Sequence, residues 1–120
     1  MYRILLVDDD EDMAELCGFW LVKAGYDVKI VNGGKDAIDA LIAESADVVL
    51  LDITMPDMSG EETLRRIRDN ILIRDTPVFF RTGLEDGDIP ENISELSPAG
   101  IIPKAEGKKM LLGVLEDFFS

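Results

Sequence analysis

Short apolar runs alternate with amphipathic stretches along the whole chain. Five runs have the length of strands: residues 4–7, 26–30, 48–51, 78–81 and 100–103. The first and third are continuously apolar, which is typical of strands that a parallel sheet buries on both faces. The second alternates apolar and polar residues, as a half-exposed edge strand does. We therefore expect the first and third strands to lie centrally in the sheet.

Between these runs, apolar residues recur at helical spacing. The expected stripes are Met13, Leu16, Cys17, Trp20, Leu21 and Ala24; then Ala37, Ile38, Leu41 and Ile42; then Leu64, Ile67 and Ile71 in a helix from about Gly60 to Asn70; and finally Leu111, Leu112, Val114, Leu115, Phe118 and Phe119. Pro90 and Pro98 restrict the fourth helix to roughly residues 91–97, because proline breaks a helix interior. We expect that helix to be short or irregular.

The alternation of strands and helices predicts a doubly wound α/β domain with a parallel sheet and helices on both faces. The sequence has 120 residues and contains no repeat, linker or low-complexity tract. We therefore expect a single domain over residues 1–120.

Charge and composition narrow the range of partners. The chain carries 12 basic and 25 acidic residues, a net charge of −13, and no histidine. The negative charge argues against direct binding to nucleic acid or to an anionic membrane, and it suits a cation or a basic partner. The lack of histidine excludes His-based zinc sites, Ser-His-Asp triads and a phosphohistidine carried on this chain.

Two further features concern location and the single cysteine. The apolar run at residues 4–7 is too short for a signal peptide, and no run approaches the length of a membrane span. We therefore expect a cytoplasmic protein that does not bind membranes. Cys17 has no partner for an internal disulfide, and we expect it to fill the core.

Polar residues stand where the predicted strands end. They are Asp8 and Asp9 after the first strand, Asp52 after the third, Thr82 after the fourth and Lys104 after the fifth. The carboxyl ends of parallel strands share one edge, so these side chains should meet in one crevice. Taken alone, each of these residues has an ordinary explanation as a turn residue, a cap or a surface charge. To explain all five in this way requires five coincidences at the same edge of the sheet.

The chemistry of this set favours phosphoryl transfer. Carboxylates brought close together repel one another, and a hard divalent cation such as Mg²⁺ relieves that repulsion. Asp52 can then attack phosphorus, while Mg²⁺ and Lys104 neutralise the phosphoryl oxygens and Thr82 donates a hydrogen bond. The expected product is an acyl phosphate on Asp52.

The chain resembles the response-regulator receiver domains of two-component signalling. The matching segments are residues 4–10, the stretch from Asp47 to Gly60 with Met55-Pro56 and Ser59-Gly60, residues 77–82, and Lys104. This resemblance implies a flavodoxin-like fold with strand order 2-1-3-4-5. It also implies a phosphoryl donor, either a histidine kinase or a histidine phosphotransfer protein, and a downstream output domain or protein.

The resemblance also assigns roles to residues. Asp52 would be the phosphoacceptor, and Asp9, Asp52 and the backbone carbonyl of Thr54 would bind Mg²⁺ directly. Asp8 would bind the cation mostly through water. Thr82 and Lys104 would bind the phosphoryl group. The first helix and the loop after the last strand would form the face that docks the kinase.

Three positions depart from the family pattern. Ile101 stands where the family has an aromatic residue, Arg81 where it has an apolar one, and Ala105 where proline follows a cis peptide bond. A cis bond before a non-proline residue is costly. We therefore expect a trans bond after Lys104 and a different direction for its side chain. We also hypothesise that phosphorylation reorganises residues 82–98 instead of moving an aromatic side chain.

Other functions remain open. The chain could be an interaction module that no longer depends on phosphorylation, although such a module need not keep the polar set at the strand ends. An aspartyl-phosphate hydrolase would want a general acid where Thr54 stands and a cap over its substrate. Asp86-Gly87-Asp88 lacks the further ligands of a calcium loop. We expect no enzymatic activity beyond self-catalysed phosphoryl acceptance and slow autodephosphorylation.

Overall fold

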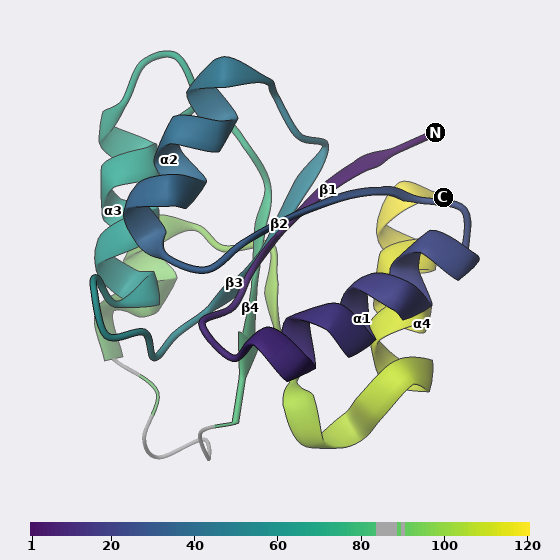
Figure 1. The fold of residues 1–120 in the computed structure, drawn as a ribbon. Coiled ribbons are helices and arrows are strands. Elements are labelled where there is room, and N and C mark those ends of the chain that lie inside the picture. Colours follow the sequence, from purple (N-terminus) through teal and green to yellow (C-terminus); the bar gives the residue numbers. More distant parts are fainter. Residues whose placement is uncertain (84–88, 90) are drawn as a thin grey trace.

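The computed structural model describes residues 1–83, 89 and 91–120. Its centre is a five-stranded parallel sheet with the order β2-β1-β3-β4-β5 (Figure 1). The strands are β1 (Arg3–Val7), β2 (Asp27–Val31), β3 (Val48–Asp52), β4 (Val78–Thr82) and β5 (Gly100–Pro103). The predicted fold class and strand order are confirmed.

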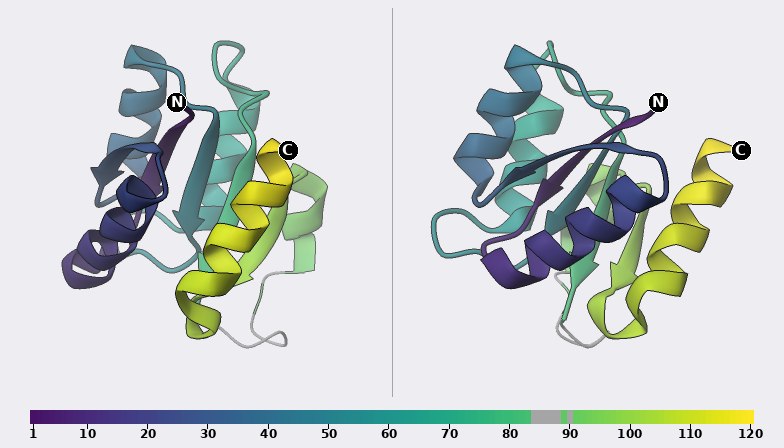
Figure 2. Two further views of the ribbon diagram at one scale, coloured as in Figure 1. Left: turned by 90° about the vertical axis from the view of Figure 1, so that its right-hand side faces the viewer. Right: turned by 45° about the vertical axis from the view of Figure 1, so that its right-hand side comes forward.

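Helices cover both faces of the sheet. One face carries α1 (Glu11–Lys23) and α4 (Gly107–Phe119), and the other carries α2 (Gly34–Ala43) and α3 (Gly60–Asp69) (Figures 1 and 2). Between β4 and β5 the described chain forms only the 3₁₀ segment η2 (Glu91–Leu96), and a second one, η3 (Lys104–Glu106), precedes α4. The expectation of a short or irregular fourth helix is confirmed for its described part. Residues 84–88 and 90, which include the Asp86-Gly87-Asp88 stretch, lie outside the described residues.

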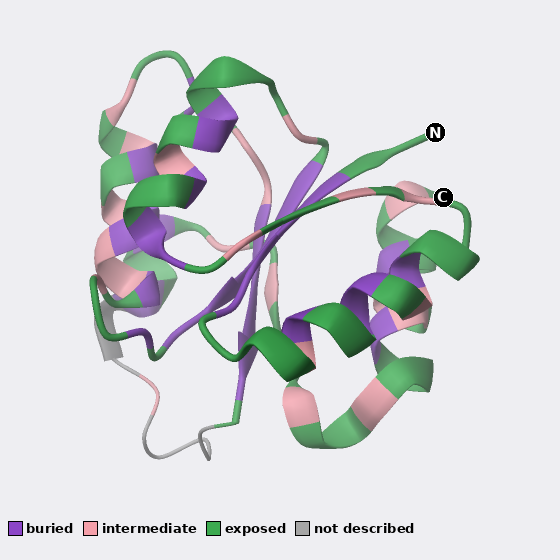
Figure 3. Ribbon diagram, viewed as in Figure 1, coloured by how far each residue is buried: buried purple, intermediate pink, exposed green. Residues whose placement is uncertain are grey.

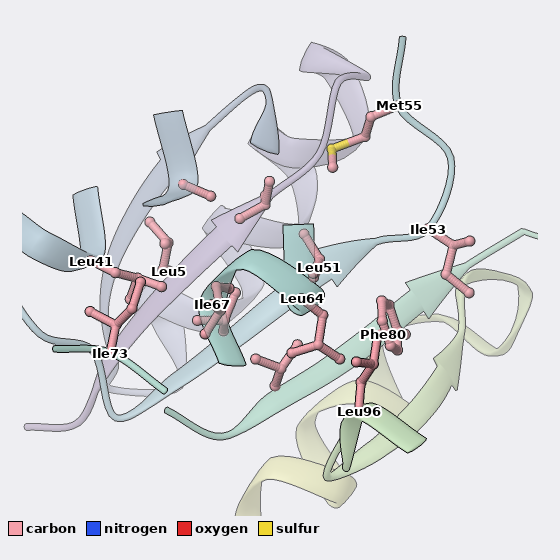
Figure 4. Packing of buried hydrophobic residues seen from close by; sticks show 14 of the residues in the cluster. Leu5, Leu41, Leu51, Ile53, Met55, Leu64, Ile67, Ile73, Phe80 and Leu96 are labelled. Atoms are coloured by element: carbon pink, nitrogen blue, oxygen red, sulfur yellow. The ribbon is translucent and has the colours of Figure 1, made fainter. Parts of the chain in front are cut away.

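Two apolar clusters, one on each face of the sheet, form the core. Alternate residues of a strand point to opposite faces, so each strand contributes to both clusters. Figure 4 shows the cluster under α2, α3 and η2, where Leu5 and Leu51 of the sheet pack with Leu41, Leu64 and Leu96. Every residue of β3 is buried, whereas β2 is partly exposed (Figure 3). The core therefore fixes β3, and with it Asp52, at the centre of the sheet.

Five residues that the sequence predicts on apolar helix faces are exposed: Leu16, Ala24, Ile42, Ile71 and Phe118. Ile71 was placed on the α3 stripe, but α3 ends at Asp69 and Ile71 is 76% exposed. Leu16 is also exposed, because the residues that α1 buries are Ala14, Cys17, Gly18 and Leu21. Ile42 of α2 is exposed as well. These two helices pack through small residues, which brings their backbones close to the sheet and leaves larger apolar side chains outside.

The carboxyl ends of all five strands lie at one edge of the sheet, as parallel pairing requires (Figure 2). The loops at this edge lead into α1, α3 and η3. In the described part of the chain no helix is both long and apolar enough to cross a membrane.

Candidate functional site

Three carboxylates meet at the carboxyl edge of the sheet. Asp8, Asp9 and Asp52 each offer one oxygen, and these oxygens all lie within 4.8 Å of one another. Asp8 and Asp52 are buried, while Asp9 is exposed. The sequence predicted this convergence from the ends of two strands that are separated by 40 residues of chain.

The turn from β1 into α1 holds Asp8 in place. The backbone N–H of Asp10 donates to Asp8 Oδ1 at 3.0 Å, and the side chain of Asp10 caps α1 by accepting from the N–H of Met13 at 3.1 Å. Asn32 Nδ2 donates to the carbonyl of Asp8 at 3.0 Å. The sequence analysis did not single out Asn32, since nothing in the local pattern marks a residue that reaches across from the end of β2.

The turn after β3 is equally tight around Asp52. The N–H of Thr54 donates to Asp52 Oδ1 at 3.3 Å, and the N–H of Gly60 donates to the carbonyl of Ile53 at 2.7 Å. A Cβ at Gly60 would collide with the backbone carbonyl of Asp52 and lie 2.8 Å from the Cα of Ile53. Gly60 therefore lets α3 begin directly against the backbone of the phosphoacceptor candidate. The ligand role of the Thr54 carbonyl remains a prediction.

Lys104 reaches the carboxylates from the end of β5. Its Nζ lies 2.9 Å from Asp8 Oδ2 and 3.2 Å from Asp52 Oδ2. No peptide bond is cis in the described chain, so the bond to Ala105 is trans as expected. The expectation that Lys104 would then point elsewhere is wrong, because η3 starts at Lys104 and its side chain still extends back over the sheet edge.

Burial perturbs both members of this ion pair. Desolvation raises the pKa of Asp52 to about 6; Lys104 and the Thr54 N–H act in the opposite direction, and Asp8 reinforces the rise. Burial by itself would lower the pKa of Lys104, but its hydrogen bonds and attraction to Asp8 and Asp52 raise that pKa above its usual value. Among the described residues, one ammonium group, that of Lys104, contacts both buried carboxylates.

The end of β4 supplies two more buried polar residues. Thr82, the last residue of β4, is buried at the same edge as Asp52. Arg81 is only 2% exposed, and among the described residues its Nε and Nη1 have no hydrogen-bond partner. The sequence marked Arg81 as unusual, but it did not predict its burial.

Cys17 is fully buried in the cluster under α1, as expected. Burial raises the pKa of its thiol, which Arg81 and Lys104 lower and Asp8 raises. A buried thiol with a raised pKa is a poor nucleophile. Cys17 is therefore a core residue.

Residues 4–116 match the response regulator receiver domain family. The chain belongs to that family. This is the family that the motifs indicated, and its match runs from the second residue of β1 through β5 and into α4.

Solved receiver structures resemble this receiver domain closely in fold. The chemotaxis protein CheY4 of Vibrio cholerae superposes with a TM-score of 0.90 at 25% identity, covering 98% of both chains. The receiver domain of a putative LuxO repressor protein from Vibrio parahaemolyticus gives 0.85 at 29% identity, covering 96% of this chain and 87% of that one.

Longer regulators are similar in sequence. The transcriptional regulatory protein CrdR of Helicobacter pylori is 31% identical over 98% of this chain and 55% of its own length. The uncharacterized transcriptional regulatory protein YrkP of Bacillus subtilis is 44% identical over 68% of this chain and 33% of its own length. The chain therefore spans between a third and about half of these relatives.

The carboxylate cluster of the receiver domain fits a hard divalent cation. Mg²⁺ is bound in proteins through one or a few carboxylate oxygens and keeps several waters. Asp8, Asp9 and Asp52 offer oxygens close enough to share one ion, and the raised pKa of Asp52 reports the repulsion and desolvation that a cation would relieve. Receiver domains generally bind Mg²⁺ at such an acidic pocket, and this chain has the donor set for it.

Proposed function

We propose that this receiver domain is a phosphorylation-dependent switch that accepts a phosphoryl group on Asp52. The observation that carries this proposal is the ion pair between Lys104 and Asp52, 3.2 Å apart and buried beside Asp8. A carboxylate so placed lies beside a cation that can move to the incoming phosphoryl oxygens, and that movement frees an oxygen of Asp52 to attack phosphorus.

The transfer itself involves one bond made and one broken. An oxygen of Asp52 forms a bond to phosphorus while the phosphorus–nitrogen bond of the donor's phosphohistidine breaks, and the leaving imidazole takes a proton from water. When bound, Mg²⁺ at Asp8, Asp9, Asp52 and the Thr54 carbonyl would supply positive charge against the phosphoryl oxygens. Lys104 would leave its carboxylates to bind one of those oxygens, and the hydroxyl of Thr82 would donate to another.

The donor in this proposal is a histidine kinase or a histidine phosphotransfer protein, because the chain has no histidine of its own. The apolar outer face of α1 is a suitable docking surface beside the site. Three large apolar side chains of this 13-residue helix, those of Leu16, Phe19 and Val22, are exposed there. A partner helix could cover these side chains and bring its phosphohistidine to the adjacent carboxyl edge.

The signal would then pass through the chain between Thr82 and Lys104. Ile101 is partly exposed on β5 and is not aromatic, so the response proposed here is a rearrangement of the residues around η2. A downstream output domain or protein would read that rearrangement. Apart from self-catalysed acceptance and slow loss of the phosphoryl group, we propose no enzymatic activity.

The deciding experiment is the intact mass of the protein after incubation with acetyl phosphate. Wild type and Asp57→Asn should gain one phosphoryl group with Mg²⁺ and none with EDTA, and Asp52→Asn should gain none. Asp57 is a matched control because it lies exposed in the loop that follows β3. Phosphorylation of Asp52→Asn would contradict the assignment. No gain by wild type, from acetyl phosphate or from purified kinases, would favour a phosphorylation-independent interaction module.

A further inference from the structure

Arg81 carries a buried positive charge that no described neighbour neutralises directly. Its side chain is 2% exposed, its Nε and Nη1 lack hydrogen-bond partners among the described residues, and no ion pair in the described chain includes it. An arginine cannot lose its proton in a protein. A buried charge of this kind is costly unless charges nearby compensate for it.

The sheet register places that charge next to the phosphorylation site. Asp52 of β3 pairs with Arg81 of β4, which in turn pairs with Ile102 of β5. Register partners on neighbouring parallel strands point to the same face and lie about 4.8 Å apart. Asp8 is the neighbour of Asp52 across β1 and β3, because the residues that precede them, Val7 and Leu51, are register partners.

Asp8, Asp52, Arg81 and Lys104 each stand two residues after a strand residue of the cluster under α1, so all four lie on that face of the sheet. Cys17 of α1 lies there, and its thiol experiences the charges of Arg81, Asp8 and Lys104. Lys104 contacts both carboxylates, whereas Arg81 lies on the strand next to Asp52 and forms an ion pair with neither of them. In this arrangement the two buried carboxylates are balanced by two cations.

We propose that Arg81 is a charge-balancing residue of the phosphorylation site, stabilising the phosphorylated state of Asp52 and opposing cation binding to the unphosphorylated site. This inference rests on the proposed function. Phosphorylated Asp52 carries about two negative charges. Together with Asp8, Asp9, Lys104 and one Mg²⁺ it leaves an excess of one negative charge, and Arg81 cancels that excess.

The proposal predicts opposite changes in two affinities, which a loss of packing would not produce. Removing the charge with Arg81→Met should tighten Mg²⁺ binding about tenfold, because a repelling charge is lost. At saturating Mg²⁺ the same variant should bind beryllofluoride, an anionic phosphoryl mimic, about tenfold more weakly. Arg81→Lys, which keeps the charge, should restore both affinities toward those of wild type.

The experiment measures Mg²⁺ binding by calorimetry and beryllofluoride binding by fluorine NMR for wild type and each variant. Arg81→Gln is a second neutral replacement, so the result does not depend on one variant folding. Arg74→Met is the matched control, because Arg74 is exposed before the opposite end of β4. Unchanged affinities in the neutral variants, or both affinities changed in the same direction, would overturn the inference while leaving the switch intact. If wild type binds neither probe, the proposed function fails and this inference fails with it.

Discussion

Lys104 Nζ lies closer to Asp8 than to Asp52, at 2.9 Å against 3.2 Å, and so ties the ends of β1, β3 and β5 together. One side chain thus holds the carboxyl edge of the sheet closed through two buried carboxylates. Because the pairs are largely buried, solvent and salt screen them less than they screen surface pairs. The site is therefore part of the stability of the fold, and not only a binding surface.

Lys104→Met should destabilise the protein when divalent cations are absent. Removing one partner of a buried pair leaves the other charge uncompensated, and we expect the free energy of unfolding to fall by about 2–4 kcal/mol. Mg²⁺ should recover part of this loss, since a cation bound by the carboxylates stabilises the folded state. Urea unfolding with EDTA and with Mg²⁺ measures both effects. Lys109→Met, on the exposed side of α4, should change little under either condition.

Asp52→Asn should stabilise the cation-free protein at neutral pH. Burial raises the pKa of Asp52 to about 6 from 3.8, so its charged form is disfavoured in the folded state. The carboxyl therefore favours folding below pH 4, and this contribution is lost as the pH rises through 6. We expect the variant to be more stable than wild type by about 1–3 kcal/mol at pH 7.

Thermal unfolding in EDTA between pH 4 and pH 7 checks the direction of this pH dependence. The extra stability of Asp52→Asn relative to wild type should decrease steadily as the pH falls from 7 to 4. Asp39→Asn, an exposed replacement on α2, serves as the control and should show no such trend. A stability difference that is independent of pH would refute this account of Asp52.

The sequence was sufficient for the fold because the strand patterns agree with the tertiary structure. The all-apolar run at β3 is buried on both faces, and the alternating run at β2 lies at the edge. Helix faces were harder to predict. The α1 pattern counted Leu16 as core, but Ala14 and Gly18 are buried instead, because small residues let this helix approach the sheet. A periodicity based on large apolar residues misses a face that small residues form.

The site was predictable wherever a polar residue ends a strand or directly follows it: Asp52 ends β3, and Asp8 and Lys104 follow β1 and β5. Contacts that depend on the direction of a side chain could not be predicted from the sequence. The reach of Lys104 over a trans peptide bond depends on the start of η3, and the burial of Arg81 depends on its register with Asp52. Neither is encoded in local spacing.

Gly60→Ala should damage both the fold and the site. The added Cβ would strike the backbone of Asp52 and Ile53, which cannot move aside as a flexible side chain could. We expect a loss of about 2–4 kcal/mol in unfolding free energy, and less phosphorylation by acetyl phosphate. Gly113→Ala is the matched control, since its Cβ meets nothing within 4 Å on α4. That variant should be stabilised by about 0.5–1 kcal/mol.

Arg68 anchors the segment that we propose carries the signal. From α3 its guanidinium donates to the carbonyls of Leu96 and Ser97 after η2, at 2.9 and 3.3 Å. It also donates to the carbonyls of Arg74 and Thr76 before β4, both at 2.8 Å. One side chain therefore holds together two chain segments that flank β4, and only a forked donor can reach all four oxygens.

Arg68→Lys and Arg68→Ala should both weaken the link between these two segments, because neither replacement has a guanidinium group that can donate to all four carbonyls. We expect unfolding free energy to fall by about 2–3 kcal/mol, and amide exchange at residues 91–99 to become faster without any phosphoryl mimic. Wild type should reach comparable exchange in that segment only with Mg²⁺ and beryllofluoride. Arg66→Ala, which loses an exposed ion pair with Glu62, should cost less than about 1 kcal/mol and leave exchange unchanged. If the Arg68 variants exchange like wild type, η2 is held by its apolar contacts alone, and the mobile element must be sought elsewhere in the chain.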